Sequence, residues 1–436
     1  MTDTDPIVIA GMSVEAPGGV ETPDELWTAL IAGKEMIEPF PRDRGWPIGE
    51  LLALSQHQAG WSKVCDAGGF LHGATEFDPA FFGIGQREAL ATDPQQRVAL
   101  RTAWRALENA GVNPGTVAGE DVGCFIGASP MEYGPRADEV NDFNGVRTVG
   151  YGTLSVAGRV SHSLGLTGPS MTIDSACASS LTALQTAANS VRAGECDWAI
   201  AGAVCVMSSA MGFFEFSKAN ALTTDGHCRS YSEDATGTLW GEGAGMVLVE
   251  RESRAKTLGH RVFGRILAVR NNHNGKGRPI LAPRTDAQER LIRRTIEASG
   301  IDPALVAMVE GHGTATRAGD PVEIVALQNT YGAAGSDPLL GSLKSNFGHA
   351  QAAAGILGLA KLLLAGQHGQ IPPTLFADRP TTRVDWESSS LRLAEAPRSW
   401  EPTDGLRYGA VSSFGAAGSN AHAIIAMPVR EENDDF

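Results

Sequence analysis

The chain has 436 residues, of which 42% are hydrophobic, so it is long enough to bury one large core or two fused halves. Its 50 acidic residues outnumber its 35 basic ones, and the formal net charge of -15 at pH 7 argues against nucleic acid as a partner. No apolar stretch is long enough to span a bilayer, so no membrane partner is expected.

The cysteines and the N-terminus bear on the compartment. The six cysteines include no C-x-x-C pair and no zinc-type spacing, and the first residues lack the basic and apolar parts of a signal peptide. We therefore expect a reduced, cytoplasmic protein without a metal site.

Short apolar runs bounded by glycine alternate with helix-like segments, a pattern typical of an α/β fold. The clearest helix is predicted to begin after Asp93, a helix-capping residue followed by Pro94, and to end at Gly111. Buried strands are expected at residues 7–11, 122–127, 198–202 and 246–250, with a second set of elements near 262–269.

Cys177 lies where a β-branched run changes to small residues and then to a helix-like segment, 181–191. A thiol at a strand-to-helix turn is close to the positive end of the helix dipole, which favours its thiolate form. The small neighbours Ala176 and Ala178 leave the sulfur accessible. A buried cysteine is more often inert packing, so this position alone is only a candidate nucleophile.

Two distant histidines, His312 and His349, also lie in surroundings of small residues and glycine. A single histidine beside glycine is more often a turn or core residue. One cysteine and two histidines together make a candidate active site.

Seven segments in a fixed order extend this pattern over nearly the whole chain. The chain resembles the β-ketoacyl synthases of the thiolase superfamily, specifically the ketosynthases of modular type I polyketide synthases. The resemblance implies a thiolase-like five-layer α-β-α-β-α fold of two similar halves. The segments that carry it are residues 5–12, 93–97, 172–181, 237–245, 310–323, 344–349 and 412–422.

The same resemblance divides the chain. We place an N-terminal half with the nucleophilic cysteine at residues 1–260 and a C-terminal half with both histidines at 261–430. An acidic tail follows at 431–436. The sequence itself shows no internal repeat, so the expected duplication comes from the family.

The implied reaction is a decarboxylative Claisen condensation. Cys177 would hold the acyl chain as a thioester, while His312 and His349 would donate to the carbonyl of a malonyl-type extender. Lys344 and Glu323 match the family's buried ion pair, which orients the histidines.

Backbone and pocket residues complete the implied site. The N–H groups of Cys177 and Phe414 would form the oxyanion hole, and Gly415 would let the Phe414 loop move as a gate. The family usually has an aromatic ring where Ala416 stands and a threonine where Ser419 stands, so we expect a wider pocket mouth. The expected substrate-binding positions are Met131, Thr314, Thr316 and Ala416.

The implied partners are an acyl carrier protein and a second copy of the chain. Substrates would arrive on the phosphopantetheine of the carrier, so no other cofactor is expected. The homodimer interface is placed at the strand 122–127 and the adjoining residues 128–131, with Met131 near the partner's acyl tunnel. Because the family-like segments fill the chain, we expect a freestanding ketosynthase that meets its carrier in trans.

Alternatives remain open for the function. A catalytically silent partner or scaffold, similar to a chain-length factor, would bind the carrier and leave Cys177 unused. A thiolase would need a second cysteine near the C-terminus, and none follows Cys228. The opening segment is similar to the discrete ketosynthase of mycobactin-type siderophore assembly, and a modular polyketide pathway with another product is the rival.

Three further features are interpreted as structural. The glycine-rich segment 237–245 lacks the lysine of a phosphate loop, so tight packing explains its glycines better. His422 is expected to be structural, and His227 beside Cys228 has no companion pair for zinc.

Overall fold

The structure, a computed structural model, describes residues 5–57, 61–135, 139–277, 279–335 and 337–429. The predicted acidic tail therefore lies outside the described residues. Eleven strands are hydrogen-bonded in the order β10-β8-β7-β12-β13-β6-β1-β5-β4-β2-β3. Only two residue pairs join β6 to β1, so the strands on either side of this junction form two sets.

The first half contributes the last five strands of this order, from β1 to β3. Its three outermost strands run parallel, and β5 is antiparallel to both β4 and β1. The strands are β1 (Ile7–Glu15), β2 (Val122–Gly127), β3 (Ser170–Ile173), β4 (Trp198–Cys205) and β5 (Gly243–Arg251).

The second half repeats this arrangement. Its outer strands are parallel up to β12, and β13 is antiparallel to β12 and to β6. The strands are β6 (Gly264–His273), β7 (Val306–Glu310), β8 (Leu339–Gly341), β10 (Arg392–Leu393), β12 (Leu406–Phe414) and β13 (Ser419–Pro428).

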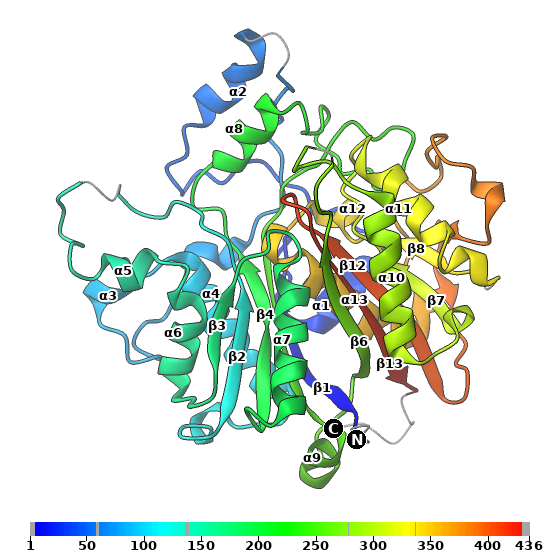
Figure 1. Ribbon diagram of the computed structural model, residues 1–436. Helices are drawn as coiled ribbons and strands as arrows, with labels where there is room; N and C mark the ends of the chain where they lie inside the picture. The colour runs from blue at the N-terminus through cyan, green and yellow to red at the C-terminus, as the bar shows by residue number, and fades with distance from the viewer. Residues whose placement is uncertain (1–4, 58–60, 136–138, 278, 336, 430–436) are drawn as a thin grey trace.

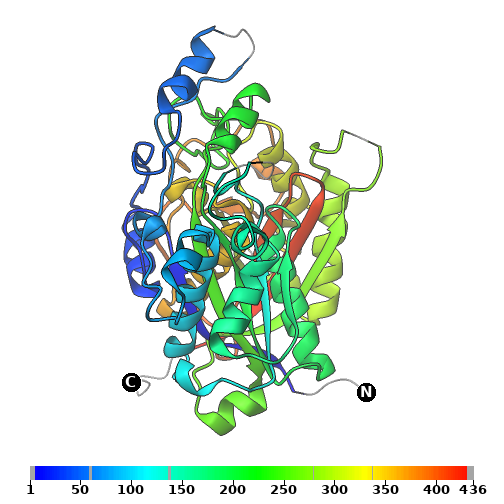
Figure 2. The same cartoon turned by 90° about the vertical axis from the view of Figure 1, so that its left-hand side faces the viewer.

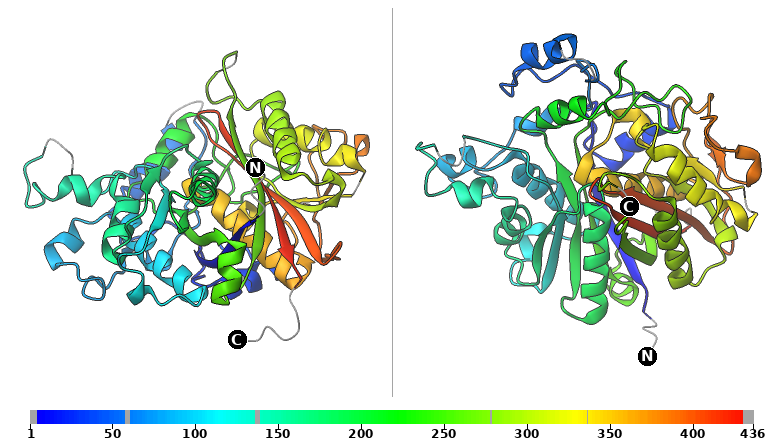
Figure 3. Two further views of the ribbon diagram at one scale, coloured as in Figure 1. Left: turned by 60° about the horizontal axis from the view of Figure 1, so that its bottom comes forward. Right: turned by 45° about the horizontal axis from the view of Figure 1, so that its top comes forward.

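The two halves join where β1 meets β6. Only Val8 with Arg265 and Ile9 with Gly264 are paired there, whereas β1 is paired with β5 along its whole length. The first strand of each half pairs with an antiparallel strand that comes last in that half: β1 with β5, and β6 with β13. The duplication is therefore visible in the topology. Figure 3 shows the blue-to-green half beside the yellow-to-red half. The boundary at residue 260 stays a prediction.

Five layers result from the way helices cover the two sets of strands (Figure 1). Helices α4 (Pro94–Asn109) and α6 (Ser155–Leu164) pack on the first set, and α10 (Thr285–Ser299) packs on the second, beside α11 (Gly319–Gln328). Between the sets lie α7 (Ser179–Ala193) and α13 (Ala354–His368), each of which contacts strands of both halves. The predicted thiolase-like fold is confirmed.

The central position of α13 explains its composition. Thirteen of its residues are buried, and all of these except Lys361 are apolar or glycine, as expected of a helix inside a core. Lys361 forms a buried ion pair with Glu310 at 2.7 Å. The predicted helix after Asp93 is also present, because the Asp93 side chain accepts from the N–H of Gln95 at 2.8 Å. Its end at Asn109 lies two residues before Gly111.

The remaining elements are shorter. Helices α2 and α8 contact each other and stand out at one end of the molecule in Figures 1 and 2. No helix in the described part of the chain is both long and apolar enough to cross a membrane. The shorter elements of the fold are α1 (Pro23–Ile31), α2 (Ile48–His57), α3 (Gln86–Leu90), α5 (Arg147–Tyr151), α8 (Met211–Lys218), α9 (Glu252–Leu258), α12 (Lys344–Phe347), β9 (Gln370–Ile371) and β11 (Arg398–Ser399).

One expectation about the sheet is wrong. The strand 122–127, expected at a two-fold interface, is β2, which is fully buried and paired on both sides by β3 and β4. A strand with both edges occupied cannot pair with another chain. The outer strand of this half is β3, where Ser170 and Met171 are exposed.

Candidate active site

Cys177 lies in the tight turn between β3 and α7. Ala176, directly before it, has a positive φ of 54°, a conformation that a residue with a Cβ adopts only when its surroundings hold it. The Ser179 hydroxyl holds this turn, since it accepts from the N–H of Ser175 at 2.9 Å and donates to the carbonyl of Ala176 at 2.6 Å. The turn therefore presents the thiol at the start of α7, as the sequence indicates.

The second half of the chain meets this turn directly. Ser413, on β12, donates its hydroxyl to the carbonyl oxygen of Cys177 at 2.6 Å. His349 Nε2 lies 3.1 Å from Cys177 Sγ. One ligand atom each of Cys177, His312 and His349 lie within 4.8 Å of one another, and the two rings stand nearly perpendicular, with centroids 5.2 Å apart. The structure thus brings together the three residues that the sequence singles out.

The hydrogen bonds of His349 define which of its nitrogens carries the proton. The backbone N–H of Gln351 donates to His349 Nδ1 at 3.1 Å, so Nδ1 is an acceptor. Burial, together with the charge of Lys344, holds the pKa of His349 well below its usual range, so the ring is neutral. The proton therefore sits on Nε2, and it points at the sulfur as a hydrogen-bond donor.

His312 is a second neutral imidazole with an unused nitrogen. Burial first, then the charge on Lys344, holds the pKa of His312 well below its usual range. Its Nδ1 is buried and has no hydrogen-bond partner among the described residues. The ring packs edge-on against Phe414, with centroids 5.5 Å apart. His312 thus lies beside Cys177 and His349 as a buried, neutral ring.

Glu323 orients the His312 loop through backbone contacts. Its carboxylate accepts from the N–H of His312 at 2.6 Å and of Gly313 at 2.8 Å, and from the Tyr231 hydroxyl at 3.0 Å. The chain passes so close to Tyr231 that a Cβ on Gly311 would lie 1.9 Å from the phenol oxygen, so only glycine fits there.

The expected direct ion pair between Lys344 and Glu323 is not formed. Within the described ranges no contact of 4.0 Å or less joins them, because the Glu323 carboxylate is already occupied by the donors of the His312 loop. Lys344 still acts over a longer distance. Burial lowers its pKa, whereas the charges on Glu310 and Glu323 raise it.

The thiol of Cys177 is protonated at rest, contrary to expectation. Burial raises the pKa of Cys177 to about 11, although the charge on Lys344 and the N–H groups of Ala416 and Cys177 oppose this rise. Loss of water outweighs the stabilisation expected from the start of α7. Formation of the thiolate therefore depends on those donors and on His349.

The loop after β12 lies beside Cys177. The backbone N–H of Ala416 opposes the rise in the pKa of the Cys177 thiol, whereas Phe414 is the last residue of β12 and is paired with Asn420. The intervening Gly415 donates its N–H to the carbonyl of Ser419 at 2.6 Å and so closes the loop. The oxyanion hole formed by the N–H groups of Cys177 and Phe414 stays a prediction.

A cavity of about 530 Å³ opens onto the three central side chains. Ala416 is exposed at this cavity, while the width of the mouth stays a prediction. Met131 is buried in the core of this chain, and its expected place near a partner's tunnel is likewise untested. The predicted residues that line the cavity are Cys177, His312, Thr314, Thr316, Glu323, His349, Phe414, Gly415 and Ala416.

The donor set does not favour a metal ion. A metal-bound histidine normally donates its second ring N–H to an acceptor. Nδ1 of His349 instead accepts a backbone N–H, so its Nε2 has no lone pair to give. Of the other histidines, His422 is held between Ser412 and Tyr331, and burial lowers its pKa to about 3. His227 contacts Glu35 at 2.6 Å.

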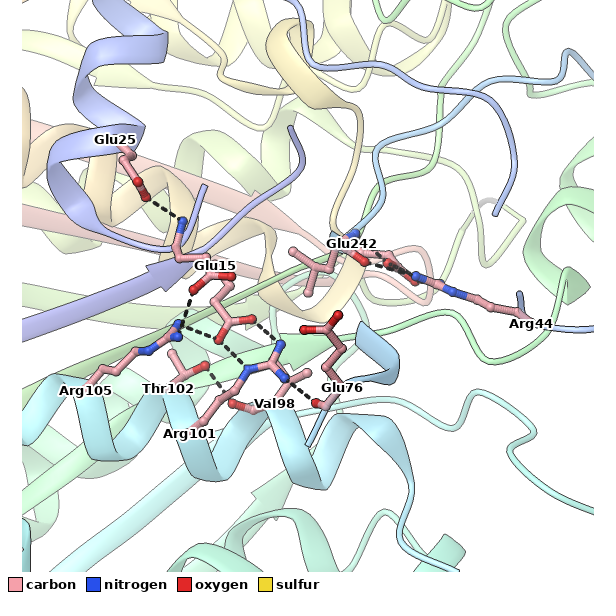
Figure 4. A network of polar contacts seen from close by, with 11 residues as sticks. Glu15, Glu25, Arg44, Glu76, Val98, Arg101, Thr102, Arg105 and Glu242 are labelled. Carbon is pink, nitrogen blue, oxygen red and sulfur yellow. Dashed lines mark hydrogen bonds and ion pairs between the residues drawn. The ribbon is translucent and has the colours of Figure 1, made fainter. Parts of the chain in front are cut away.

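A buried ion pair fixes the segment that holds His349 (Figure 4). Glu242 is fully buried, binds the Arg44 guanidinium through both oxygens and accepts from the N–H groups of Leu71 and Met207. Just before it, the chain exchanges two backbone hydrogen bonds with His349. These run from His349 N–H to the Leu239 carbonyl at 2.7 Å and from Gly241 N–H to the His349 carbonyl at 3.0 Å.

The sequence analysis missed Arg44 and Glu242. They are 198 positions apart, so no local sequence pattern pairs them. The segment around Glu242 was interpreted only from its glycines. Those glycines do serve close packing, because a Cβ on Gly241 would lie 2.5 Å from the Phe347 carbonyl oxygen. A second cluster in Figure 4 ties β1 to α4, where Glu15 pairs with Arg101 and Arg105.

A thiol and two neutral imidazoles at the junction of two repeated halves define a thiolase-like condensing enzyme, and comparisons with known proteins agree. The chain matches the family model "Beta-ketoacyl synthase, N-terminal domain" over residues 4–255. It matches "Beta-ketoacyl synthase, C-terminal domain" over residues 263–378. The chain therefore belongs to the β-ketoacyl synthase family.

Its curated relatives are much longer proteins. The chain is 45% identical over 433 residues to erythronolide synthase EryA3 of Saccharopolyspora erythraea, and 44% over 434 residues to polyketide synthase GfsA of Streptomyces halstedii. It is 43% identical over 433 residues to mycoketide-CoA synthase of Mycobacterium tuberculosis. Each alignment covers 98% of this chain, but only 14%, 6% and 10% of these relatives, respectively.

Solved ketosynthase structures share the fold. The oxazolomycin ketosynthase domain OzmH KS7 of Streptomyces albus JA3453 has a TM-score of 0.89 at 35% identity, covering 99% of this chain and 75% of that one. The ketosynthase from module 6 of the bacillaene synthase of Bacillus subtilis 168 has a TM-score of 0.86 at 33% identity. That match covers 97% of this chain and 72% of the other.

The first prediction concerns the pH dependence of Cys177. Because its pKa is raised to about 11, the reactive thiolate is a small fraction at neutral pH. Its rate of alkylation by iodoacetamide should rise about tenfold per pH unit between pH 7 and 9. Lys344→Met removes a charge that opposes the rise, so alkylation should slow. Mass spectrometry of the peptide containing Cys177 gives the rate, and a plateau below pH 8 would contradict the assignment.

The second prediction concerns the ion pair of Arg44 and Glu242. Arg44→Met leaves a buried carboxylate without its partner and should lower the free energy of unfolding by about 3–5 kcal/mol. The double variant Arg44→Met/Glu242→Gln removes the charge as well, so it should lose less than the sum of the two single variants. Denaturant titration measures all three. Additive losses would show that the two side chains are not coupled.

Proposed function

We propose that this chain catalyses decarboxylative Claisen condensation between an acyl chain on Cys177 and a malonyl-type thioester of an acyl carrier protein. The observation that carries the proposal is the geometry around the sulfur. A hydrogen-bond donor, His349 Nε2, stands 3.1 Å from Cys177 Sγ in a cavity that a pantetheine-linked substrate can enter. The phosphopantetheine arm belongs to the carrier, so the chain needs no cofactor of its own.

Acyl transfer to the enzyme is the first half-reaction. The Cys177 thiolate attacks the carbonyl carbon of the acyl-carrier thioester, and the N–H groups of Cys177 and Phe414 stabilise the oxyanion. The bond between the carbonyl carbon and the carrier sulfur then breaks. The carrier thiolate leaves and takes up the proton that Cys177 lost, so one thioester replaces another.

Decarboxylation and carbon–carbon bond formation follow. The malonyl group loses carbon dioxide, and the electron pair of the broken bond forms an enolate. Its oxygen accepts from His349 Nε2 and from a ring nitrogen of His312, which are neutral donors in a buried site. The enolate carbon attacks the Cys177 thioester, and the cysteine leaves as thiolate and is protonated again.

The finer assignments belong to this proposal. We infer that the chain works in the cytoplasm on substrates of an acyl carrier protein, with no nucleic-acid or membrane partner. Its product is a polyketide, and a mycobactin-type siderophore is the narrower candidate. The competing function is a silent scaffold. The position of His349 Nε2 at 3.1 Å from Cys177 Sγ, with a ligand atom of His312 within 4.8 Å of both, argues for catalysis.

We also propose a homodimer formed through the free edge of β3. This strand ends the sheet, and apolar side chains on it and on the segments beside it are exposed: Val149 by 54%, Leu154 by 65% and Met171 by 48%. A free, apolar strand edge is a ready site for pairing with a second chain. Permanent homodimers bury roughly 2,000–5,000 Å² of such surface.

The test of function separates acylation from decarboxylation. Cys177→Ala should abolish condensation, because no group holds the acyl chain, and keep part of the malonyl decarboxylation, because both histidines remain. Cys177→Gln should decarboxylate faster, since its amide imitates the thioester carbonyl. Mass spectrometry quantifies acetyl-carrier and condensed product, with Cys65→Ala as the matched control. Full condensation by Cys177→Ala would overturn the assignment, and a scaffold would leave Cys177 without any acyl group.

The dimer is tested at the strand edge. Met171→Asp places a charge on the proposed apolar interface and should convert a dimer of about 90 kDa into the monomer of 45.7 kDa in light scattering. Leu258→Asp changes a residue of similar exposure on α9, away from β3, and should stay dimeric. A monomeric parent protein, or a Met171→Asp dimer of unchanged stability, would contradict the interface.

A further inference from the structure

The central helix α13 contains a buried charge that the proposed condensation does not use. Lys361 is 1% exposed, and its ammonium group pairs with Oε2 of Glu310 at 2.7 Å. Glu310, which is also 1% exposed, is the last residue of β7. A Cβ on Gly358 of α13 would lie 3.0 Å from Glu310 Cγ, so glycine lets the helix approach the carboxylate closely. A buried ion pair adds little stability over apolar side chains, so stability alone does not account for this one.

The other carboxylate oxygen of Glu310 holds the start of α12. Glu310 Oε1 accepts the backbone N–H of Leu343 at 2.7 Å, and Leu343 is directly followed by Lys344, the first residue of α12. His312 follows Glu310 by two residues, just after the end of β7. The carboxylate therefore joins β7, α12 and α13 at the place where the chain leads to both His312 and Lys344.

Lys344 has no counter-ion at contact distance. Among the described residues, no carboxylate oxygen lies within 4.0 Å of its ammonium nitrogen. Burial lowers the pKa of Lys344, and the charges that oppose this effect are first that of Glu310 and then that of Glu323. Glu310 is thus the carboxylate that acts most strongly on this ammonium group, although its own contact partner is Lys361. The titratable groups that face Lys344 are Cys177, Cys228, Glu310, His312, Asp320, Glu323 and His349.

On the basis of the proposed function, we propose that Glu310 is a positioning residue for the condensation, with Lys361 as its counter-ion. One oxygen of Glu310 places Lys344 by holding the N–H before it, and the negative charge keeps the Lys344 ammonium group charged inside the protein. Lys361 balances this carboxylate, because burial of a lone carboxylate is unfavourable. Glu310 does not line the cavity, so it acts through Lys344, whose charge favours the Cys177 thiolate.

The experiment measures alkylation of Cys177 by iodoacetamide between pH 7 and 9, in the parent protein and in Glu310→Gln. The glutamine keeps an oxygen for the N–H of Leu343 but has no charge, so Lys344 should lose its proton at a lower pH. Alkylation of the variant should therefore be about 3- to 10-fold slower than that of the parent at pH 9 and nearly equal at pH 7. Loss of a negative charge that acted directly on the thiol would instead speed alkylation, so slower alkylation identifies an effect through Lys344.

A double variant and a matched control separate this role from stability. Glu310→Gln/Lys361→Met removes the whole pair, so denaturant titration should show that it recovers part of the stability that Glu310→Gln loses. It should still be alkylated more slowly than the parent at pH 9, whereas a purely structural pair would restore the rate together with the stability. Glu250→Gln changes another buried carboxylate, paired with Arg254 and His260 away from the cavity, and should leave the pH profile of alkylation unchanged.

The inference and the proposed function fail in different ways. Parent-like or faster alkylation of Glu310→Gln at pH 9 overturns the inference and leaves the proposed function standing, as does a return to the parent rate in the double variant. Absence of condensation by a folded parent protein, whose Cys177 is alkylated as described, overturns the proposed function and the inference with it. Either Glu310 variant suffices if the other does not fold.

Discussion

The site depends on one positive charge, on Lys344, held inside the protein. Burial of an ammonium group is unfavourable, and the carboxylates of Glu310 and Glu323 offset part of that cost. This charge acts on three surrounding groups. It helps to keep His312 and His349 neutral, so that each ring donates a hydrogen bond and keeps its proton. It also opposes the rise in the pKa of the Cys177 thiol that burial causes. A neutral residue at this position would leave the thiol harder to ionise.

The duplicated fold is what makes this centre possible. The thiol comes from a turn in the first half. In the second half, His312 follows β7, Lys344 begins α12 and His349 lies just after α12. The halves share few strand pairs at β1 and β6, so the buried helices α7 and α13 between them carry much of the contact. Ser413 adds a direct hydrogen bond from β12 to the carbonyl of Cys177. Relative movement of the halves would therefore pull the donors away from the sulfur.

The sequence predicted what is local and missed what is distant. The fold, the family and the grouping of Cys177 with two histidines followed from motifs, and the helix after Asp93 followed from its cap. Ala416 was noticed for its missing ring, whereas its structural contribution is a backbone N–H, which any residue could supply. The ion pair of Arg44 and Glu242 joins positions too far apart for a pattern to link. The expectation that Cys177 is a thiolate at rest was wrong. The motif indicates that a helix starts there, but it does not show how completely water is excluded from the sulfur.

The segment 238–242 combines two properties that are usually separate. Its backbone holds His349, the Glu242 side chain anchors it to Arg44, and Thr238 and Trp240 line the cavity. A movement of Trp240 is therefore transmitted to the catalytic donor, since the His349 backbone is bonded to the residues on either side of Trp240. The wall of the cavity and the position of His349 are thus set by the same short stretch of backbone. The buried ion pair gives that stretch the rigidity both properties need.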